Sequence, residues 1–164
     1  MDYLENIEAA GFIITKQTNP NKLSTEYLNR YKNNPAGYIE FLNQFETIIN
    51  PEETVWFNSI EVFNGETDTD FAWNAFEQIS LEALEGDDEE IQDILDFWDN
   101  QIPILLSVKE YEYLAICLTD ENYGTIVHGV EPELEETSIV CSNFNELMSL
   151  MRNASNTDFL KFFV

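Results

Sequence analysis

The chain has 164 residues, of which 32 are acidic and only seven are basic, so its formal net charge is −25. Its length suits one domain, and its 13 % aromatic content separates it from disordered acidic chains, which are poor in aromatics. A surface this negative repels nucleic-acid phosphates and anionic lipids, which argues against direct binding to DNA, RNA or a membrane. The same charge attracts basic proteins, although it is also compatible with a role in solubility alone.

Neither a membrane helix nor a secretion signal is expected from the sequence. No window of 18 uninterrupted apolar residues is present. The stretch MDYLENIEAAGF lacks the basic region of a secretory signal. The two cysteines, Cys117 and Cys141, are too few for a disulfide framework. We therefore expect a cytoplasmic protein with reduced, buried thiols.

The first fifty residues show mainly helical spacing. The stretch DYLENIEAA predicts a short helix that ends at Gly11, and the apolar run FIIT follows it. Residues 24–33 predict a second helix with Ser24 as its N-cap. A third, longer helix is predicted from Pro35 to Asn50, because its apolar side chains recur every three or four residues.

The middle of the chain mixes acidic and aromatic residues. Residues 54–63 are rich in β-formers and end at a turn signal, so they predict a strand. Two helices are expected next, one across FAWNAFEQI and a second whose apolar face ends at Trp98. The intervening EGDDEE is expected to be a solvated turn that pivots at Gly86.

Apolar runs of strand length dominate from residue 102 onward. IPILLSV, EYEYLAICLT and GTIVHGV predict three strands, and DENYG joins the last two as a hairpin. TSIVCS predicts a further strand. A last helix is expected after it, because Asn143 and Glu146 have the spacing of a capping box. The apolar tail TDFLKFFV is expected to pack back on the domain. This order predicts a single α+β domain over residues 1–164, with a mixed or mostly antiparallel sheet of about four to six strands flanked by helices.

The sequence offers little catalytic or metal-binding chemistry. His128 is the only histidine, and it alternates with apolar residues in GTIVHGV, which is typical of a structural strand residue. Cys117 and Cys141 also lie in apolar strands, where thiols behave as small hydrophobic groups. No CxxC pair, P-loop or GxGxxG motif is present. We expect no enzyme, metal or cofactor, and a hydrolase that uses His128 and acidic clusters is the least favoured alternative.

The candidate functional residues are instead acidic and aromatic. The densest acidic runs are most simply explained as solvated charge, and a charged docking surface is the functional alternative; the four glutamates of EPELEE are expected to face solvent. The three aromatics of FAWNAF do not fit one helical face, so Trp73 is our candidate for an exposed binding hot spot. The predicted partner-binding residues are Trp73, Asp87, Asp88, Glu89, Glu90, Asp120, Glu121, Glu131, Glu133, Glu135 and Glu136.

Several segments of the chain resemble the SUKH superfamily, the Smi/Knr-like domain. The matching positions are Pro35, Tyr38, Phe41 and Leu42 in the family's LP-x-x-Y-x-x-FL helix, and Ser142, Phe144, Glu146 and Leu147 in its A-D-S-F-x-E-F-L helix. Three intervening segments are also similar to those of the family: WFNSIEVF, FWDNQIPILLS, and the hairpin from YEYLAICL to GTIVHGVEPELEE. The resemblance spans roughly residues 23–152, and the chain departs from the family in lacking glycines after the FL helix.

This resemblance implies an α+β domain without a catalytic motif. Bacterial members are mostly immunity proteins that bind and neutralise a cognate toxin, often a nuclease, so the expected partner is a basic protein toxin. Eukaryotic relatives serve as regulatory protein-binding modules, so a module with an endogenous cytoplasmic partner is the alternative. We expect a monomer or a weak homodimer, because exposed sheet edges permit pairing.

Overall fold

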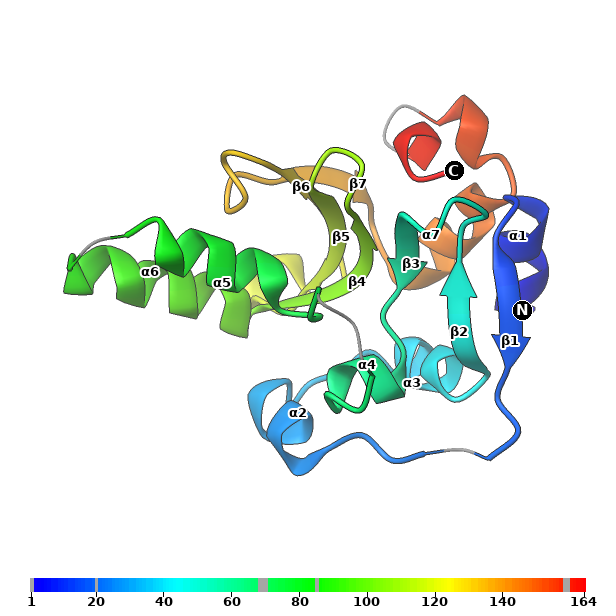
Figure 1. Cartoon of the computed structure of the whole chain (residues 1–164), viewed down its shortest axis with the longest axis horizontal. Coiled ribbons are helices and arrows are strands. Elements are labelled where there is room, and N and C mark those ends of the chain that lie inside the picture. Colours follow the sequence, from blue (N-terminus) through cyan, green and yellow to red (C-terminus); the bar gives the residue numbers. More distant parts are fainter. Residues whose placement is uncertain (1, 20, 68–70, 85, 158–159) are drawn as a thin grey trace.

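The computed structural model describes residues 2–19, 21–67, 71–84, 86–157 and 160–164. These residues form one antiparallel sheet whose seven strands follow one another in space as they do in the chain, with helices on both faces (Figure 1). The strands are β1 (Ile13–Lys16), β2 (Phe45–Ile49), β3 (Val55–Phe57), β4 (Gln101–Ser107), β5 (Glu112–Cys117), β6 (Ile126–Val130) and β7 (Ser138–Cys141). The α-helices are α1 (Tyr3–Ala9), α2 (Thr25–Arg30), α3 (Ala36–Leu42), α4 (Ile60–Phe63), α5 (Ala75–Glu82), α6 (Asp88–Asp99) and α7 (Phe144–Met151). Three short 3₁₀ turns are η1 (Asp120–Asn122), η2 (Ala154–Asn156) and η3 (Leu160–Phe162).

The predicted α+β class is confirmed, and the sheet has more strands than predicted. The two additional strands are β1, which contains most of the run FIIT, and β2. The β2 segment lies inside the region predicted as one helix from Pro35 to Asn50, and that prediction is wrong beyond Leu42. A short apolar run such as this one is compatible with the spacing of a helix and with that of a strand. Thr47, Ile48 and Ile49 are β-branched, which favours the strand.

The predicted strand over residues 54–63 is also shorter than expected. It ends at Phe57, and the buried Asn58 side chain then donates a hydrogen bond to the Pro103 carbonyl at 2.8 Å. Ser59 begins α4 as its N-cap, because its Oγ accepts a hydrogen bond from the Val62 amide at 3.3 Å. A serine that can cap a helix therefore overrides the β-propensity of the residues that follow it.

Helix ends that depend on local caps agree with the sequence. Ser24 Oγ accepts from the Tyr27 amide at 3.1 Å and begins α2. Asn143 Oδ1 accepts from the Glu146 amide at 2.9 Å and begins α7. The β5–β6 pair forms the predicted hairpin, and Leu160 and Phe163 of the C-terminal tail are fully buried, as the prediction for the tail requires.

Two hydrophobic clusters lie on opposite faces of the sheet. The first and larger cluster packs α1, α3, α7 and the C-terminal tail on one face, and it includes Val55 and Phe57. The second cluster packs α5 and α6 on the other face, over Leu106, Tyr113 and neighbouring strand residues. Successive side chains of a strand point to opposite faces, so Trp56 lies on the second face, between two residues of the first. Among the described residues, no helix has the length and apolar character needed to cross a membrane.

Candidate functional site

The α5–α6 hairpin forms the most acidic part of the described structure. Asp87 is the N-cap of α6, and its Oδ1 accepts hydrogen bonds from the amides of Glu89 and Glu90 at 3.1 and 3.2 Å. The stretch EGDDEE was predicted to be a turn, and this is wrong for its last three residues, which form the first turn of α6. Acids in the first turn of a helix are stabilised by the helix dipole, which explains why they extend the helix.

Acidic side chains continue along the exposed side of α6. Asp93 and Asp96 follow Glu89 at helical spacing, and all three are exposed. We call the exposed residues Asp87, Asp88, Glu89, Glu90, Asp93 and Asp96 the α6 acidic face. The sequence did not lead us to Asp93 and Asp96, although Asp93 is four residues after Glu89 and Asp96 is three residues after Asp93, a spacing that places all three on one side of a helix.

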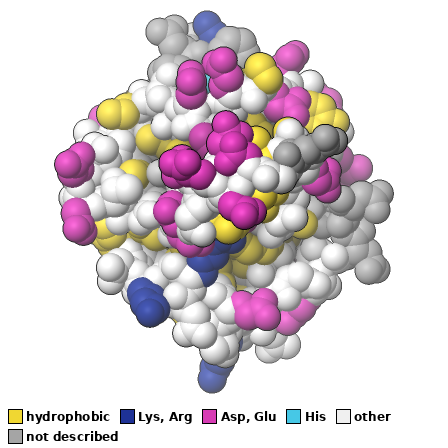
Figure 2. All heavy atoms as spheres, turned by 90° about the vertical axis from the view of Figure 1, so that its left-hand side faces the viewer, with side chains coloured by type: hydrophobic (Ala, Val, Ile, Leu, Met, Phe, Trp, Pro, Cys, Tyr) yellow, Lys and Arg dark blue, Asp and Glu magenta, His cyan; other side chains and the backbone are white. Residues whose placement is uncertain are grey.

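The α6 acidic face has few basic side chains to compensate it. All seven lysines and arginines lie outside residues 33–108, whereas just over half of the acids lie within them. Figure 2 views the molecule from the side of the α5–α6 hairpin and shows many Asp and Glu side chains with few Lys or Arg. The hairpin therefore presents net negative charge to solvent.

Arg30 of α2 holds this hairpin to the rest of the domain. Its guanidinium donates two hydrogen bonds to the buried Glu77 of α5, at 2.9 and 2.7 Å, and its Nε lies 3.0 Å from Asp99 of α6. Burial disfavours the charged guanidinium, but hydrogen bonding and attraction from Glu77 outweigh it and raise the pKa of Arg30 above its ordinary value. A bidentate pair fixes orientation as well as distance, so Arg30 orients α5, and its contact with Asp99 ties the C-terminal end of α6 to α2.

The loop after β6 is attached to the same hairpin. Trp98 Nε1 of α6 donates a hydrogen bond to Glu135 Oε1 at 2.9 Å, and the Tyr113 hydroxyl donates to the Leu134 carbonyl. Leu134 is buried in the second cluster. Glu131, which precedes a cis proline, is exposed together with Glu133 and Glu136. Glu135 is only partly exposed, so the expectation that all four glutamates of EPELEE face solvent is wrong for that residue, because its carboxylate pairs with the indole.

The structure separates the remaining acidic candidates from this loop. Asp120 and Glu121 are exposed on η1, which follows β5, whereas Glu131 follows β6. Because β5 and β6 are antiparallel neighbours, the two loops leave the sheet at opposite ends. A five-residue strand separates them by about 17 Å. The predicted acidic residues are therefore distributed around the domain and do not form one cluster.

Trp73 is not the exposed aromatic that the sequence predicted. It precedes α5, is only partly exposed, and packs on Tyr31 and Phe63 with ring centroids 6.1 and 5.5 Å away. The Arg30 guanidinium lies 5.6 Å from its ring centroid. An irregular segment lets the indole turn inward, which helical spacing does not anticipate. Among the described residues, Tyr111 and Tyr123 are the aromatics with large exposure, at 42 and 49 %.

The residues considered for catalysis have structural surroundings. His128 Nε2 lies 2.8 Å from Glu112 Oε2, and its ring meets Phe163 of the C-terminal tail edge to face. Both side chains are largely buried, at 12 and 5 % exposure. Burial raises the pKa of the Cys141 thiol to about 11, so this thiol is protonated and poorly nucleophilic at neutral pH. Within the described ranges, no group of three or more His, Cys, Asp or Glu side chains has the arrangement of a metal site.

The fold and this surface define an α+β domain that presents a negatively charged helix to solvent. No family model matches the chain, and neither the curated proteins nor the solved structures contain a match. What the surface binds must therefore be argued from its own chemistry.

Proposed function

We propose that this chain is an immunity protein that binds a basic, nuclease-type protein toxin in the cytoplasm and holds it inactive. The observation that carries the proposal is the α6 acidic face, a group of six exposed carboxylates on and around one helix. The resemblance of residues 23–152 to the SUKH superfamily also supports it. A regulatory module with an endogenous partner has the same need for a docking surface and is the competing outcome.

A nuclease holds phosphates with basic side chains, so its substrate-binding surface attracts an acidic helix. Glu89, Asp93 and Asp96 lie on one side of α6 because they are four and three residues apart, and their combined charge steers the approaching partner and speeds association. Arg30 pairs with Glu77 of α5 and contacts Asp99 of α6, so it attaches the hairpin to α2 before the partner docks and lowers the conformational entropy lost on docking. Binding of this kind blocks the substrate site by occupation and requires no chemistry from the inhibitor.

Co-expression tests the function directly. The toxin encoded beside this gene is expressed alone, with this chain, and with an unrelated acidic protein of similar charge. We expect survival only with this chain, and purification of a complex from the surviving cells. Equal killing in all three cultures would refute the immunity function for that toxin. Recovery of a housekeeping protein from the native cells, with no toxin bound, would favour the regulatory module.

Charge variants test which surface binds. Glu89→Gln combined with Asp93→Asn removes two charges from the α6 acidic face, and Glu8→Gln combined with Glu40→Gln removes two exposed charges from α1 and α3. We expect the α6 variant to lower the association rate constant several-fold at low salt and the matched variant to leave it nearly unchanged. We also expect raised ionic strength to reduce the difference between the two, because salt screens exposed charges.

A further inference from the structure

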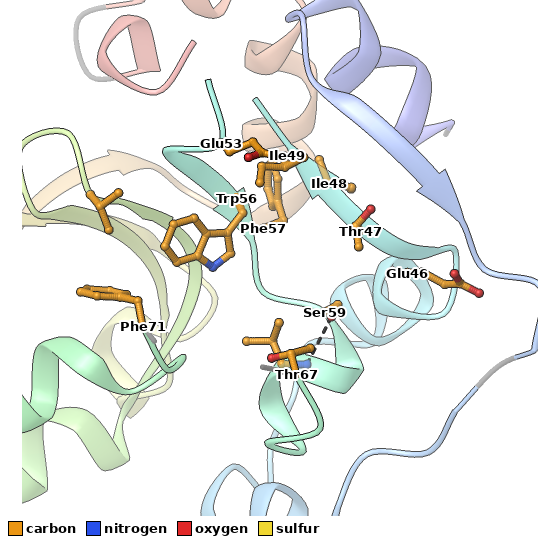
Figure 3. Close-up of a pocket in the computed structure, with 12 residues that line it drawn as sticks. Glu46, Thr47, Ile48, Ile49, Glu53, Trp56, Phe57, Ser59, Thr67 and Phe71 are labelled. Carbon is orange, nitrogen blue, oxygen red and sulfur yellow. Dashed lines mark hydrogen bonds between the residues drawn. The ribbon is translucent and has the colours of Figure 1, made fainter. Parts of the chain in front are cut away.

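An apolar groove lies on the second face of the sheet, beside the α5–α6 hairpin. It encloses about 550 Å³. We call it the Trp56 groove, and its main apolar and floor residues are Thr47, Ile49, Trp56, Val62, Phe71 and Val108. Figure 3 shows the Trp56 indole between β3 and Phe71, with Thr47 and Ile49 along β2. The two rings meet edge to face with their centroids 5.8 Å apart.

The strand register explains why the groove is open. Leu106, Trp56, Ile49 and Ile13 are successive neighbours across β4, β3, β2 and β1, so they form one row on the second face. Leu106 is fully buried beneath the hairpin, Trp56 and Ile49 are partly exposed, and Ile13 is 56 % exposed. Helices α5 and α6 therefore cover the central strands and leave the β1–β3 end of an apolar row uncovered. Uncovered apolar surface of this kind is typical of a binding site.

Carboxylates accompany the apolar lining. Glu46 near the start of β2 and Glu53 in the turn after β2 both line the groove, and Figure 3 shows them well apart along the β2–β3 segment. Of the lining residues that the structure describes, none is a lysine or an arginine. Glu52 lies one position from Glu53, Glu110 lies two positions from Val108, and both are exposed. Two exposed bases are also close: Lys109 follows Val108, and Lys16 of β1 pairs with Phe45, the residue before Glu46. The groove thus combines an apolar floor with a predominantly negative rim.

The turn that carries Glu53 is held in an unusual conformation. Glu53 has φ of 58°, in the left-handed region that favours glycine. The Asn50 side chain fixes this turn by accepting hydrogen bonds from the amides of Thr54 and Val55, both at 2.8 Å. Tyr111, the other described non-glycine residue with positive φ, packs on Phe71 at the groove wall. Such conformations cluster at binding sites, where the surrounding structure maintains them.

We propose that the Trp56 groove receives an apolar side chain from a segment of the basic partner in which lysine or arginine flanks that side chain. This inference rests on the proposed function and assigns it a second contact. The floor of Ile49, Trp56 and Phe71 excludes water around the apolar group, and Glu46 and Glu53 attract the flanking cations. The α6 acidic face then governs the association rate, and the groove governs the dissociation rate, because buried anchor residues dominate how long a complex lasts.

The probe is the peptide acetyl-Lys-Lys-Leu-Lys-Lys-amide, compared with a peptide that has serine in place of leucine and one that has glutamate in place of lysine. Titration is followed by the indole N–H resonances of ¹⁵N-labelled protein. Trp73 and Trp98 serve as internal controls, because the first packs on Arg30 and the second bonds Glu135. We expect the leucine peptide to shift the Trp56 resonance saturably, and at least tenfold weaker binding of the serine peptide.

Thr47→Arg is the decisive variant. Thr47 is exposed on the groove floor, so arginine there fills the groove and repels cations without disturbing the core. Ser149→Arg on α7, which covers the opposite face, is the matched control. We expect Thr47→Arg to abolish the peptide shift and Ser149→Arg to retain it. Should the Trp73 and Trp98 resonances show that Thr47→Arg is unfolded, Ile49→Ala replaces it, with an expected loss of affinity of several-fold.

The outcomes separate this inference from the proposed function. Three results would overturn the groove as the site. They are equal Trp56 shifts with the leucine and serine peptides, full binding of the leucine peptide to Thr47→Arg, and binding of the glutamate peptide as strong as that of the lysine peptide. With the toxin, an unchanged dissociation rate for Thr47→Arg would also overturn it, although cell survival would still support the immunity function. Failure of co-expression to protect, together with a leucine-specific Trp56 shift, would reject the immunity function and retain the groove as a site for basic apolar segments.

Discussion

The two faces of the sheet differ in how completely they are covered. On the first face, α1, α3, α7 and the tail enclose a cluster in which Phe41 alone contacts five aromatic rings. On the second face, α5 and α6 cover β4–β6 only, and the Trp56 groove remains beside them. The first face therefore supplies most of the stability, and the second face keeps its apolar and acidic surface available for a partner.

The two faces are also held together by different forces. The first cluster is almost entirely apolar and closes by burial and ring packing. The hairpin on the second face combines a smaller apolar cluster with the Arg30–Glu77 ion pair and the Trp98–Glu135 hydrogen bond. Polar contacts contribute less net stability than apolar burial but specify orientation. Four experiments test this difference, from the largest expected effect to the smallest.

Core truncation on the two faces gives the largest contrast. Phe41→Ala removes a side chain with 0 % exposure and is expected to lower the free energy of unfolding by about 4 kcal/mol. Trp56→Ala removes a larger but partly exposed side chain, and we expect a loss of about 1 to 2 kcal/mol. Urea denaturation followed by far-ultraviolet circular dichroism measures both. Equal losses would show that the groove is part of the stabilising core, contrary to the comparison.

Breaking the ion pair tests how the hairpin is attached. Arg30→Met leaves Glu77, whose side chain is 4 % exposed, without its partner, and we expect a loss of about 3 kcal/mol. The double variant Arg30→Met with Glu77→Leu removes both charges and is expected to recover most of that loss. Hydrogen exchange should show the single variant opening α5 and α6 before the first cluster. Additive losses in the double variant would mean that the two side chains act independently.

Alkaline pH tests the first cluster. Cys141 has a folded pKa of about 11, above its ordinary value of 9.0, because burial disfavours the thiolate. The unfolded state therefore releases this proton first, so stability is full below pH 9 and falls between pH 9 and 11. Burial also raises the pKa values of Tyr27, Tyr31 and Tyr38, which add to the loss above pH 10. We expect Cys141→Ala to delay the onset of the decline from about pH 9 to about pH 10. A decline that begins at the same pH in both proteins would exclude Cys141 as its cause.

The smallest effect concerns charge placement along α6. Asp96 lies in the last turn of the helix, where negative charge opposes the helix dipole, and Asp88 lies in the first turn, where negative charge is favourable. We expect Asp96→Asn to raise the free energy of unfolding by about 0.5 kcal/mol and Asp88→Asn to raise it less or to lower it. Both variants change the net charge equally, so their difference isolates position on the helix. Thermal unfolding at low ionic strength measures it, and identical shifts would leave only general charge repulsion as an explanation.

Much of the fold could be predicted because the relevant signals are local. Ser24 and Asn143 cap their helices as expected, the β5–β6 hairpin forms at DENYG, and Trp98 ends the apolar face of α6. Where local signals compete, prediction failed: residues 45–49 satisfy both helical and strand periods, and pairing with β1 decided for the strand. Propensity alone does not contain that pairing, because the partner strand lies about thirty residues away in the chain.

The candidate site shows the same division. The sequence by itself determined the negative charge, the absence of lysine and arginine from residues 33–108, and the acidic start of α6. Only the tertiary structure turned Trp73 inward, paired Arg30 with Glu77, joined Glu135 to Trp98, and left Trp56 at the edge of the covered surface. Charge and helix caps depend on residues a few positions apart in the chain. Burial and long-range pairs depend on which surfaces meet, and those surfaces meet only when the helices pack on the assembled sheet.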